Sequence, residues 1–391
     1  MKLRNLINRK SCSYKRPLVL QMPVTSRCNS RCKTCNIWKN KKCVDIDSHD
    51  LRQVLQSPLY SKVRAVGLNG GEFTLHPNFI QVIESVLTLP SLSSVYLITN
   101  GLFPKKLFEL LRKAKKICDT RKVSLFIGIS VDGAKTVHEH IRGIPNCFNK
   151  TEEIINELYN NKEHYCNNFS VICTLSKDNI AFIRETEYFL EQYKDISIEY
   201  QLAVPNLRIQ TYDDYDGYYV LSDDRARMLA LEFFYEKYKT ACNTMKKQQC
   251  FVIYQFLKNK GKGRLCKCNY LDGDLTIDEH LNLSLCATAS RTVGNVRKED
   301  SIEIINSSTF KQERKRIERL CNSCIHYSDN PLTFKGRVIL INEIIHDMYI
   351  YQWYKIASQN KIFLKKSFYS FIKRITYDYL KLIYIYLWRL R

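Results

Sequence analysis

The chain has 391 residues, 45% of them hydrophobic, which is enough for a buried core and more than one domain. Its 61 Lys and Arg outnumber 39 Asp and Glu and give a net charge of +22, which favours acidic partners. No recognised nucleic-acid motif accompanies this charge, so we do not infer nucleic-acid binding from it. Sixteen cysteines without a secretory leader lead us to expect a reducing cytoplasm, where cysteine clusters more often bind metal than pair.

Apolar, β-branched runs alternate with amphipathic runs along the first half of the chain. Strands are expected at Leu18–Val24, Val63–Leu68, Val95–Thr99, Val123–Val131, Phe169–Leu175 and Ile196–Leu202. Helices are expected between them, for example at Asn78–Leu89, Lys105–Cys118, Thr151–Tyr165 and Ile180–Tyr193. This alternation predicts an α/β fold whose parallel sheet is covered by helices.

Polar residues and glycines follow these predicted strands. The second strand ends in Asn69–Glu72, the third in T-N-G from Thr99, and the fourth in S-V-D-G from Ser130. Each run alone is typical of an ordinary turn. The carboxyl ends of parallel strands lie at one edge of a sheet, so together they indicate a single site there.

Three cysteines, Cys28, Cys32 and Cys35, stand just after the first predicted strand with x3 and x2 spacing. Three thiolates hold three irons of a four-iron cluster and leave the fourth iron open to a substrate or cofactor. The same cysteines suit a zinc site completed by His49 or a distant cysteine.

The run G-L-N-G-G-E at Gly67–Glu72 comes next, again at the end of an apolar segment. With both motifs in register, residues 17–205 resemble the radical S-adenosylmethionine (radical SAM) superfamily. The resemblance implies a partial (β/α)6 TIM-like barrel that is open on one side. One departure is Thr34, where many members place an aromatic residue before the third cysteine.

The resemblance also implies how S-adenosylmethionine is bound. Its amino and carboxylate groups chelate the open iron, the G-G-E loop approaches its methionine end, Glu72 accepts from its ammonium group, Ser130 and Asp132 suit the ribose, and Arg142 suits a carboxylate. The implied cofactor-binding residues are Gly70, Gly71, Glu72, Asn100, Ser130, Asp132 and Arg142. For Arg142, a solvated arginine at a helix end remains an alternative.

A second group of cysteines lies at Cys266, Cys268, Cys286, Cys321 and Cys324. A β-hairpin is expected to deliver Cys286, and one charged helix is expected over Ser301–Leu320. This segment resembles the twitch, a shortened relative of the SPASM domain, with Leu281 where that hairpin usually has glycine. The resemblance implies an auxiliary [4Fe–4S] cluster on Cys268, Cys286, Cys321 and Cys324. Cys266 is the fallback ligand, and a structural zinc site is the alternative.

The sequence therefore divides into five segments. They are a basic N-terminal segment (1–16), the radical SAM partial barrel (17–205), a helical bridge (206–263) with a helix around Asp223–Lys246, the twitch-like iron–sulfur domain (264–326) and a helical basic and aromatic tail (327–391). Within the tail, aromatic side chains on one face of residues 361–391 and basic ones opposite suit an anionic membrane surface, or docking on the protein itself.

The resulting hypothesis is a radical SAM enzyme with two [4Fe–4S] clusters. As the resemblance implies, it cleaves S-adenosylmethionine reductively to a 5′-deoxyadenosyl radical, which removes a hydrogen atom from an unidentified peptide, saccharide or small molecule. Oxidation, crosslinking or epimerisation would follow, and in epimerisation Cys266 is the candidate catalytic hydrogen donor. An electron donor such as flavodoxin or ferredoxin is implied. The enzyme is expected in the cytoplasm or peripherally at the inner membrane face. The rival hypotheses are a zinc or iron–sulfur scaffold at the membrane surface and an RNA-binding protein.

Overall fold

A computed structural model describes residues 16–209 and 217–359. It contains two compact units, residues 1–330 and 331–391. The first unit begins with six parallel strands at the positions that the sequence predicts. They are β1 (Val19–Thr25), β2 (Ala65–Gly70), β3 (Ser94–Thr99), β4 (Ser124–Ser130), β5 (Asn168–Leu175) and β6 (Ser197–Leu202).

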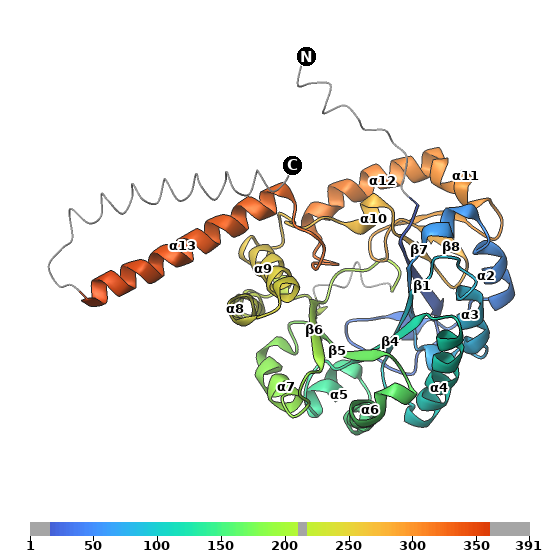
Figure 1. The fold of residues 1–391 in the computed structure, drawn as a ribbon, viewed down its shortest axis with the longest axis horizontal. Coiled ribbons are helices and arrows are strands. Elements are labelled where there is room, and N and C mark those ends of the chain that lie inside the picture. Colours follow the sequence, from blue (N-terminus) through green and yellow to red (C-terminus); the bar gives the residue numbers. More distant parts are fainter. Residues whose placement is uncertain (1–15, 210–216, 360–391) are drawn as a thin grey trace, which may run out of the picture. The chain divides into compact units, whose positions relative to one another are not determined.

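Helices follow these strands and cover the outside of the sheet (Figure 1). They are α2 (Ser48–Val54), α3 (Phe79–Val86), α4 (Pro104–Thr120), α5 (Thr136–Arg142), α6 (Cys147–Asn161) and α7 (Ile183–Leu190). The sheet order is sequential from β6 back to β1, and the sheet does not close on itself. This confirms the predicted α/β fold with an open, partial (β/α)6 barrel.

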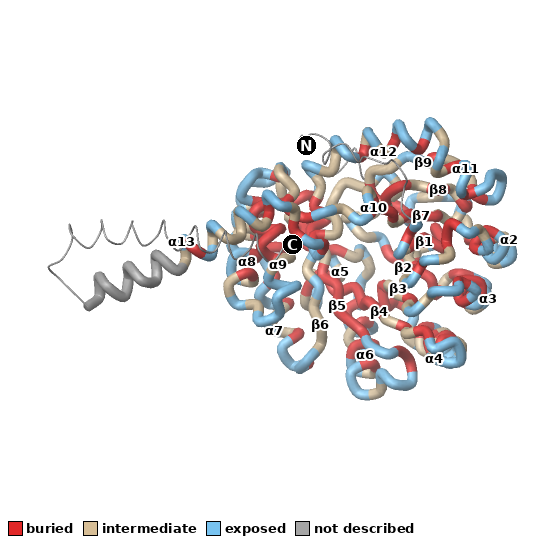
Figure 2. The backbone as a smooth tube through the Cα atoms, turned by 45° about the horizontal axis from the view of Figure 1, so that its top comes forward, coloured by how far each residue is buried: buried red, intermediate tan, exposed pale blue. Residues whose placement is uncertain are grey.

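The strands bury their outward-facing residues against the helices. Leu125, Ile127 and Ile129 of β4 are fully buried, and equivalent residues of the neighbouring strands join them in one apolar core. Figure 2 shows the buried residues concentrated on the strands and on the sides of the helices that face them. Because successive side chains of a strand point to opposite faces, the remaining strand residues face the interior of the open barrel.

A second group of elements extends the same sheet beyond β1. The predicted hairpin consists of β7 (Leu275–Ile277) and β8 (Asn282–Ser284), which is followed by β9 (Thr292–Asn295). β7 pairs in parallel with β1, so the nine-stranded sheet runs β6-β5-β4-β3-β2-β1-β7-β8-β9. The hairpin turn holds Leu281 at a φ of 61°, a conformation that favours glycine, although Leu281 itself is buried in the core.

Two helices predicted as continuous are each divided in the structure. The bridge contains α8 (Asp224–Thr240) and α9 (Thr244–Lys258), because the side chain of Asn243 accepts hydrogen bonds from the amides of Met245 and Lys246 and starts a new helix. The predicted charged helix consists of α11 (Ser301–Asn306) and α12 (Ser308–Leu320), since Ser307 is extended and caps the second helix through the amide of Phe310. A short helix, α10 (Asn269–Asp272), precedes the hairpin.

The second compact unit is described as far as Gln359 and contains α13 (Phe334–Gln359). In the part of the chain that the structure describes, no helix is long and apolar enough to cross a membrane. The predicted membrane-binding stretch, residues 361–391, and nearly all of the basic N-terminal segment lie outside the described residues.

Substituting Gly128 tests how closely the interior of the barrel is packed. A Cβ atom at Gly128 would lie 2.4 Å from Cδ1 of Ile172 and 2.6 Å from the hydroxyl of Tyr96. We expect Gly128→Ala to lower the free energy of unfolding by about 1–3 kcal/mol, as overpacking does. Urea unfolding measures the effect. Gly217→Ala is the matched control, because a Cβ atom there meets no atom within 4 Å; equal effects of the two variants would contradict the prediction.

Candidate functional site

The loop that carries Cys28, Cys32 and Cys35 leaves the carboxyl end of β1 and is held by the G-G-E loop after β2. The amides of Gly71 and Glu72 each donate a 2.7 Å hydrogen bond, to the carbonyls of Thr25 and Arg27. A Cβ atom at Gly71 would lie 2.0 Å from the carbonyl oxygen of Arg27. The structure therefore explains why position 71 needs a glycine, which the sequence did not reveal. The two loops are in direct backbone contact, and a side chain would not fit between them.

On its other side the cysteine loop contacts the end of α5. The amides of Arg31 and Lys33 donate 2.9 Å hydrogen bonds to the carbonyls of Arg142 and Ile141. The last carbonyls of a helix have no partner within the helix, so the cysteine loop caps α5. Gly143 follows in the left-handed conformation and ends the helix.

Two of the three thiols, those of Cys28 and Cys32, form hydrogen bonds with groups on different elements. The hydroxyl of Ser30 lies 3.1 Å from Sγ of Cys32, Nη1 of Arg142 lies 3.5 Å from the same sulfur, and Nδ2 of Asn100 lies 3.8 Å from Sγ of Cys28. N–H and O–H groups directed at cysteine sulfurs are the protein's means of tuning an iron–sulfur cluster, so these residues fit one.

The thiols are close enough to influence each other's protonation. Burial raises the pKa of Cys28 to about 12, and the charges of Cys32, Glu72 and Cys35 add to this effect. Burial also raises the pKa of Cys35 to about 11. Among the described residues, no three His, Cys, Asp or Glu side chains are arranged to hold one metal ion. A four-iron cluster is a different case, because each thiolate binds a separate iron.

Glu72 and Asn100 connect the ends of β2 and β3. The carboxylate of Glu72 is buried and accepts hydrogen bonds from the amide of Asn100 at 2.7 Å, the hydroxyl of Thr99 at 3.0 Å and the amide of Thr74 at 3.3 Å. Asn100 also donates to Oδ1 of Asn29 at 2.8 Å. Glu72 therefore holds the strand ends together in this structure, and its contact with the cofactor's ammonium group stays a prediction.

Arg142 and Asp132 form a buried ion pair at the end of β4. Nη2 of Arg142 lies 2.9 Å from Oδ2 of Asp132, and the amide of Thr174 donates to Oδ1 at 2.9 Å. Burial raises the pKa of Asp132, and Arg142 opposes that shift. Burial works against the charged form of Arg142 as well, but Asp132 and Cys32 raise its pKa above the usual value, so we infer an ionised pair.

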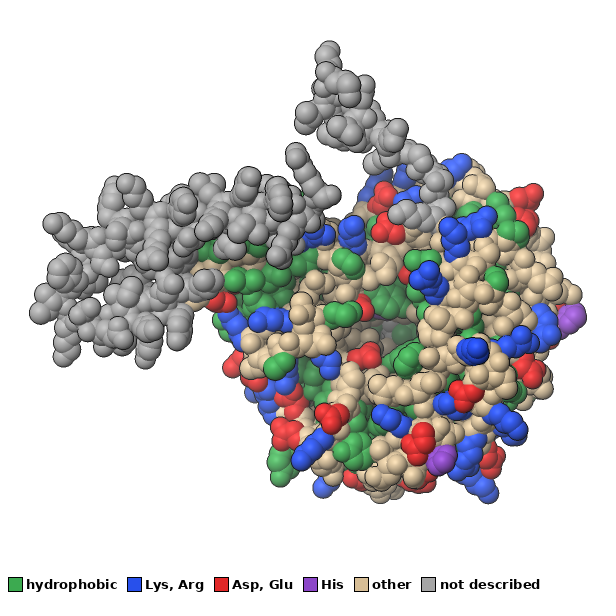
Figure 3. Space-filling view, viewed as in Figure 1, with side chains coloured by type: hydrophobic (Ala, Val, Ile, Leu, Met, Phe, Trp, Pro, Cys, Tyr) green, Lys and Arg blue, Asp and Glu red, His purple; other side chains and the backbone are tan. Residues whose placement is uncertain are grey.

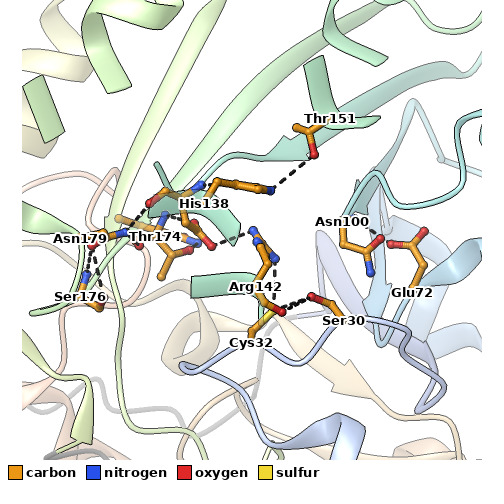
Figure 4. A network of polar contacts seen from close by, with 12 residues as sticks. Ser30, Cys32, Glu72, Asn100, His138, Arg142, Thr151, Thr174, Ser176 and Asn179 are labelled. Atoms are coloured by element: carbon orange, nitrogen blue, oxygen red, sulfur yellow. Dashed lines mark hydrogen bonds and ion pairs between the residues drawn. The ribbon is translucent and has the colours of Figure 1, made fainter. Parts of the chain in front are cut away.

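A network of buried polar side chains supports this pair (Figure 4). Nδ1 of His138 accepts from the amide of Asp132 at 3.2 Å, and burial lowers the pKa of His138 well below its usual value. The side chain of Asn179 donates to the carbonyls of Asp132 at 2.8 Å and Thr174 at 2.9 Å. The sequence suggested Arg142 for a cofactor carboxylate and Asp132 for the ribose. In the structure the two residues pair with each other, and their contacts with S-adenosylmethionine stay predictions.

Ser130 and Gly70 are the remaining predicted cofactor-binding residues, and they also lie at this end of the barrel. Ser130 ends β4 opposite Ile172 of β5 and is 9% exposed. Gly70 has a φ of 118°, and a Cβ atom there would lie 2.6 Å from the carbonyl of Thr25. The predicted cofactor residues and the three cysteines therefore all come from loops and strand ends at one edge of the sheet.

Arg208 is a site residue that the sequence did not single out. It follows β6, its Nη2 lies 2.9 Å from Oε2 of Glu279 in the hairpin turn, and its charge opposes the rise that burial causes in the pKa of Cys35. Its Nε is buried without a hydrogen-bond partner among the described residues. The segment lacks any motif that would have identified Arg208, since its role depends on a contact between distant parts of the chain.

The second cysteine group also comes together. Cys268, Cys286 and Cys321 belong to one small apolar cluster with Tyr270 and Ile317. A hydrogen bond with Cys321 lowers the pKa of Cys268 to about 6 and raises that of Cys321. The amide of Ala289 lies 3.3 Å from Sγ of Cys286. These contacts favour Cys268 over Cys266 as the ligand.

Cys266 occupies a different environment from the other cysteines of this group. It is 2% exposed, and its thiol is directed at the carbonyl of Tyr327, 3.7 Å away. Burial raises its pKa to about 11. Its assignment as a hydrogen donor therefore stays a prediction that needs the thiol to become accessible.

Part of the barrel interior is a polar wall, although Ile98, Phe126 and Ile172 share that face of the sheet. Tyr96 and Ser170 are in hydrogen-bond contact at 3.1 Å, Asn69 donates to Gln21 at 3.1 Å, and Gln201 donates to Thr174 at 3.0 Å. Figure 3 shows the molecule hollowed at the centre of the ring of strands. None of the six strands contains Lys or Arg, and Glu199 is their one charged residue.

The Arg142–Asp132 pair predicts a large effect of a conservative substitution. Asp132→Asn leaves Arg142 charged and buried, so we expect the free energy of unfolding to fall by about 3–5 kcal/mol. Asp119→Asn, which breaks the pair with Lys115 on the surface of α4, should change it by less than about 1 kcal/mol. Urea unfolding measures both variants, and similar values for the two would show that the buried pair is not needed.

The site can now be compared with known proteins. Residues 22–186 match the sequence profile of the Radical SAM superfamily. A GTP 3′,8-cyclase of Haemophilus influenzae (strain PittEE) is 28% identical over 188 residues, which is 46% of this chain and 51% of that protein. Another GTP 3′,8-cyclase, of Vibrio parahaemolyticus, is 30% identical over 119 residues, which is 29% of this chain and 33% of that protein. The chain spans about a third to a half of the curated relatives that it matches.

Solved structures share the fold. anSMEcpe with bound AdoMet superposes with a TM-score of 0.55 at 16% identity. The superposition covers 76% of this chain and 83% of the anSMEcpe chain. Streptococcus suis SuiB bound to S-adenosylmethionine gives a TM-score of 0.54 at 13% identity, with coverages of 81% and 76%. Superfamily members use a [4Fe–4S] cluster and S-adenosylmethionine. Residues 22–186, with their cysteine loop and G-G-E loop in contact, form a domain of the radical SAM superfamily.

Proposed function

We propose that this chain is a radical SAM enzyme that acts on a polar substrate inside the open barrel and has an auxiliary iron–sulfur cluster. The observation that carries the proposal is the backbone contact between the cysteine loop, the G-G-E loop and the end of α5. These contacts bring the three thiols and the strand-end residues to one place. A zinc-binding scaffold would also need the three thiols together, but not the polar strand-end residues beside them.

In this proposal, Cys28, Cys32 and Cys35 hold three irons of a [4Fe–4S] cluster, and S-adenosylmethionine binds the fourth. When bound, the reduced cluster and S-adenosylmethionine supply a 5′-deoxyadenosyl radical that removes a hydrogen atom from an unactivated C–H bond. Arg142 holds a positive charge at Cys32, and Asn100 donates to Cys28. Glu72 fixes the strand ends against which the cofactor lies, and the backbone at Gly70 and Gly71 meets its methionine end.

The auxiliary cluster is assigned to Cys268, Cys286, Cys321 and Cys324. The contact of Cys268 with Cys321 and their shared apolar cluster with Cys286 support this set. Four thiolates leave no iron open, which suits electron transfer rather than substrate binding. The net reaction would then be an oxidation of the substrate.

The substrate class follows from the polar wall of the barrel. Amide and hydroxyl groups there form hydrogen bonds with an uncharged polar substrate, and Glu199 attracts a cation and repels an anion. A peptide segment satisfies these conditions. anSMEcpe has been solved with a bound Cp18Cys peptide, and SuiB with its precursor peptide SuiA. We therefore propose a peptide in preference to a saccharide or a nucleoside triphosphate.

The electron donor, such as flavodoxin or ferredoxin, remains a prediction, as does binding of an anionic membrane through residues 361–391. Both would use the excess of basic residues, which attracts acidic partners.

The first test is formation of 5′-deoxyadenosine. Anaerobic protein reconstituted with iron and sulfide, then given reductant and S-adenosylmethionine, should release it. Cys28→Ser, Cys32→Ser and Cys35→Ser should each lower the amount to background, because each removes an iron ligand. Cys242→Ser, which changes an exposed cysteine, should retain wild-type formation. No product from the wild type with both clusters present would refute the proposal.

The second test addresses the substrate class. Because the strands of the barrel carry no cation and Arg208, which follows β6, is already paired with Glu279, we expect GTP to bind more weakly than about 1 mM. We also expect that GTP does not increase formation of 5′-deoxyadenosine or become modified. Calorimetry measures the binding of GTP, and liquid chromatography measures the amounts of GTP and 5′-deoxyadenosine. Consumption of GTP, with a matching amount of 5′-deoxyadenosine, would show that the substrate is a nucleotide after all.

A further inference from the structure

Arg264 lies between the two chain segments that carry the auxiliary cysteines. Its backbone is fixed to the C-N-S-C segment, since the amides of Gly263 and Arg264 both donate to the carbonyl of Asn322, at 2.9 and 3.2 Å. Two residues further on, the chain reaches Cys266, and then Cys268. Arg264 is thus attached to one cysteine segment and leads directly into the other.

The guanidinium group of Arg264 uses all five of its N–H donors on backbone carbonyls of these segments. Toward residues 266–267, Nε donates to Cys266 at 3.0 Å and Nη2 donates to Lys267 at 3.0 Å. Toward residues 324–327, the acceptors are the carbonyls of Cys324 at 3.2 Å and His326 at 2.7 Å for Nη1, and of Tyr327 at 2.8 Å for Nη2.

This arrangement has a physical purpose. Apart from a single β-bridge at Cys266, the backbone around these five carbonyls lies outside strands and helices, and carbonyls that converge on one point repel each other unless a donor lies between them. The planar guanidinium supplies five donors in a fixed geometry, whereas lysine has three donors on a flexible chain. The same group also places a positive charge beside the cysteines, and the charge near an iron–sulfur cluster is one determinant of its reduction potential.

We propose that Arg264 is the positioning residue of the auxiliary metal site. It fixes the segment of Cys268 against the segment of Cys324, so that their thiols reach one cluster, and its charge raises the reduction potential of that cluster. The inference rests on the proposed function only in assigning a cluster to these cysteines. Arg264 does not contact substrate or S-adenosylmethionine in this proposal.

The experiment compares full-length Arg264→Lys and Arg264→Gln with the wild type, each in the Cys28→Ser background, where the auxiliary site is the cluster that remains. Arg319→Lys is the matched control, because Arg319 is exposed on α12 two residues before Cys321. After anaerobic reconstitution with iron and sulfide, the readouts are iron and sulfide per chain, the electron paramagnetic resonance spectrum of the reduced protein and the midpoint potential. Circular dichroism reports whether each variant is folded.

We expect both Arg264 variants to lose at least half of the auxiliary iron, and the control to lose none. The cluster that remains in Arg264→Gln should have a more negative potential than in Arg264→Lys, because only lysine keeps the charge. Unchanged iron content, spectrum and potential in both variants would overturn the proposal. So would equal losses in Arg264→Lys and the control. If glutamine prevents folding, the lysine variant decides the question.

Failure of the proposed function gives a different result. Wild-type protein that holds zinc at Cys268, Cys286, Cys321 and Cys324 would refute the auxiliary cluster. The same variants would then be compared by their zinc content. Loss of zinc in the Arg264 variants, with none in Arg319→Lys, would still support a positioning role, and no loss would overturn it.

Discussion

The candidate site depends on one buried arginine. Through its side chain, Arg142 contacts Asp132 and the sulfur of Cys32; through its carbonyl, it accepts from the amide of Arg31 and the hydroxyl of Ser30. A buried charge is costly unless it is paired, so the positions of Asp132 and the cysteine loop are linked. The network of His138, Thr174 and Asn179 then fixes Asp132 to the ends of β4 and β5. The geometry of the cysteine loop therefore depends on the residues at the ends of β4 and β5 as well as on the loop itself.

The barrel separates two chemical environments across a single sheet. Outward-facing strand residues are apolar and pack against the helices, while several inward-facing residues are polar: Gln21, Tyr96 and Gln201 form hydrogen bonds with Asn69, Ser170 and Thr174. A closed barrel of this type fills its interior with branched apolar side chains. Here the sheet is open and part of its inner face carries hydrogen-bonding side chains.

The two cysteine sites are physically connected in two ways. β7 pairs with β1, so the hairpin that precedes Cys286 continues the sheet from which the first cysteine loop emerges. The segment after β6 contacts both sites: Leu207 donates to the carbonyl of Thr288, Arg208 pairs with Glu279, and the amide of Asn36 donates to the carbonyl of Ile209. Each cysteine site also contains a partly buried arginine, Arg142 in one and Arg264 in the other. One continuous framework therefore includes both cysteine sites.

The sequence alone determined the six strands, the cysteine spacing and the set of polar residues at the strand ends, because these features depend on the local order of residues. It could not identify the breaks at Asn243 and Ser307, where a single capping side chain outweighs the helical pattern on either side. Nor could it select Arg208 and Arg264 for their roles among 61 basic residues, pair Arg142 with Asp132, or predict that β7 joins β1. The tertiary structure decided these points, since the partner of a buried charge or an unpaired strand edge is chosen by proximity in space between residues far apart in the chain.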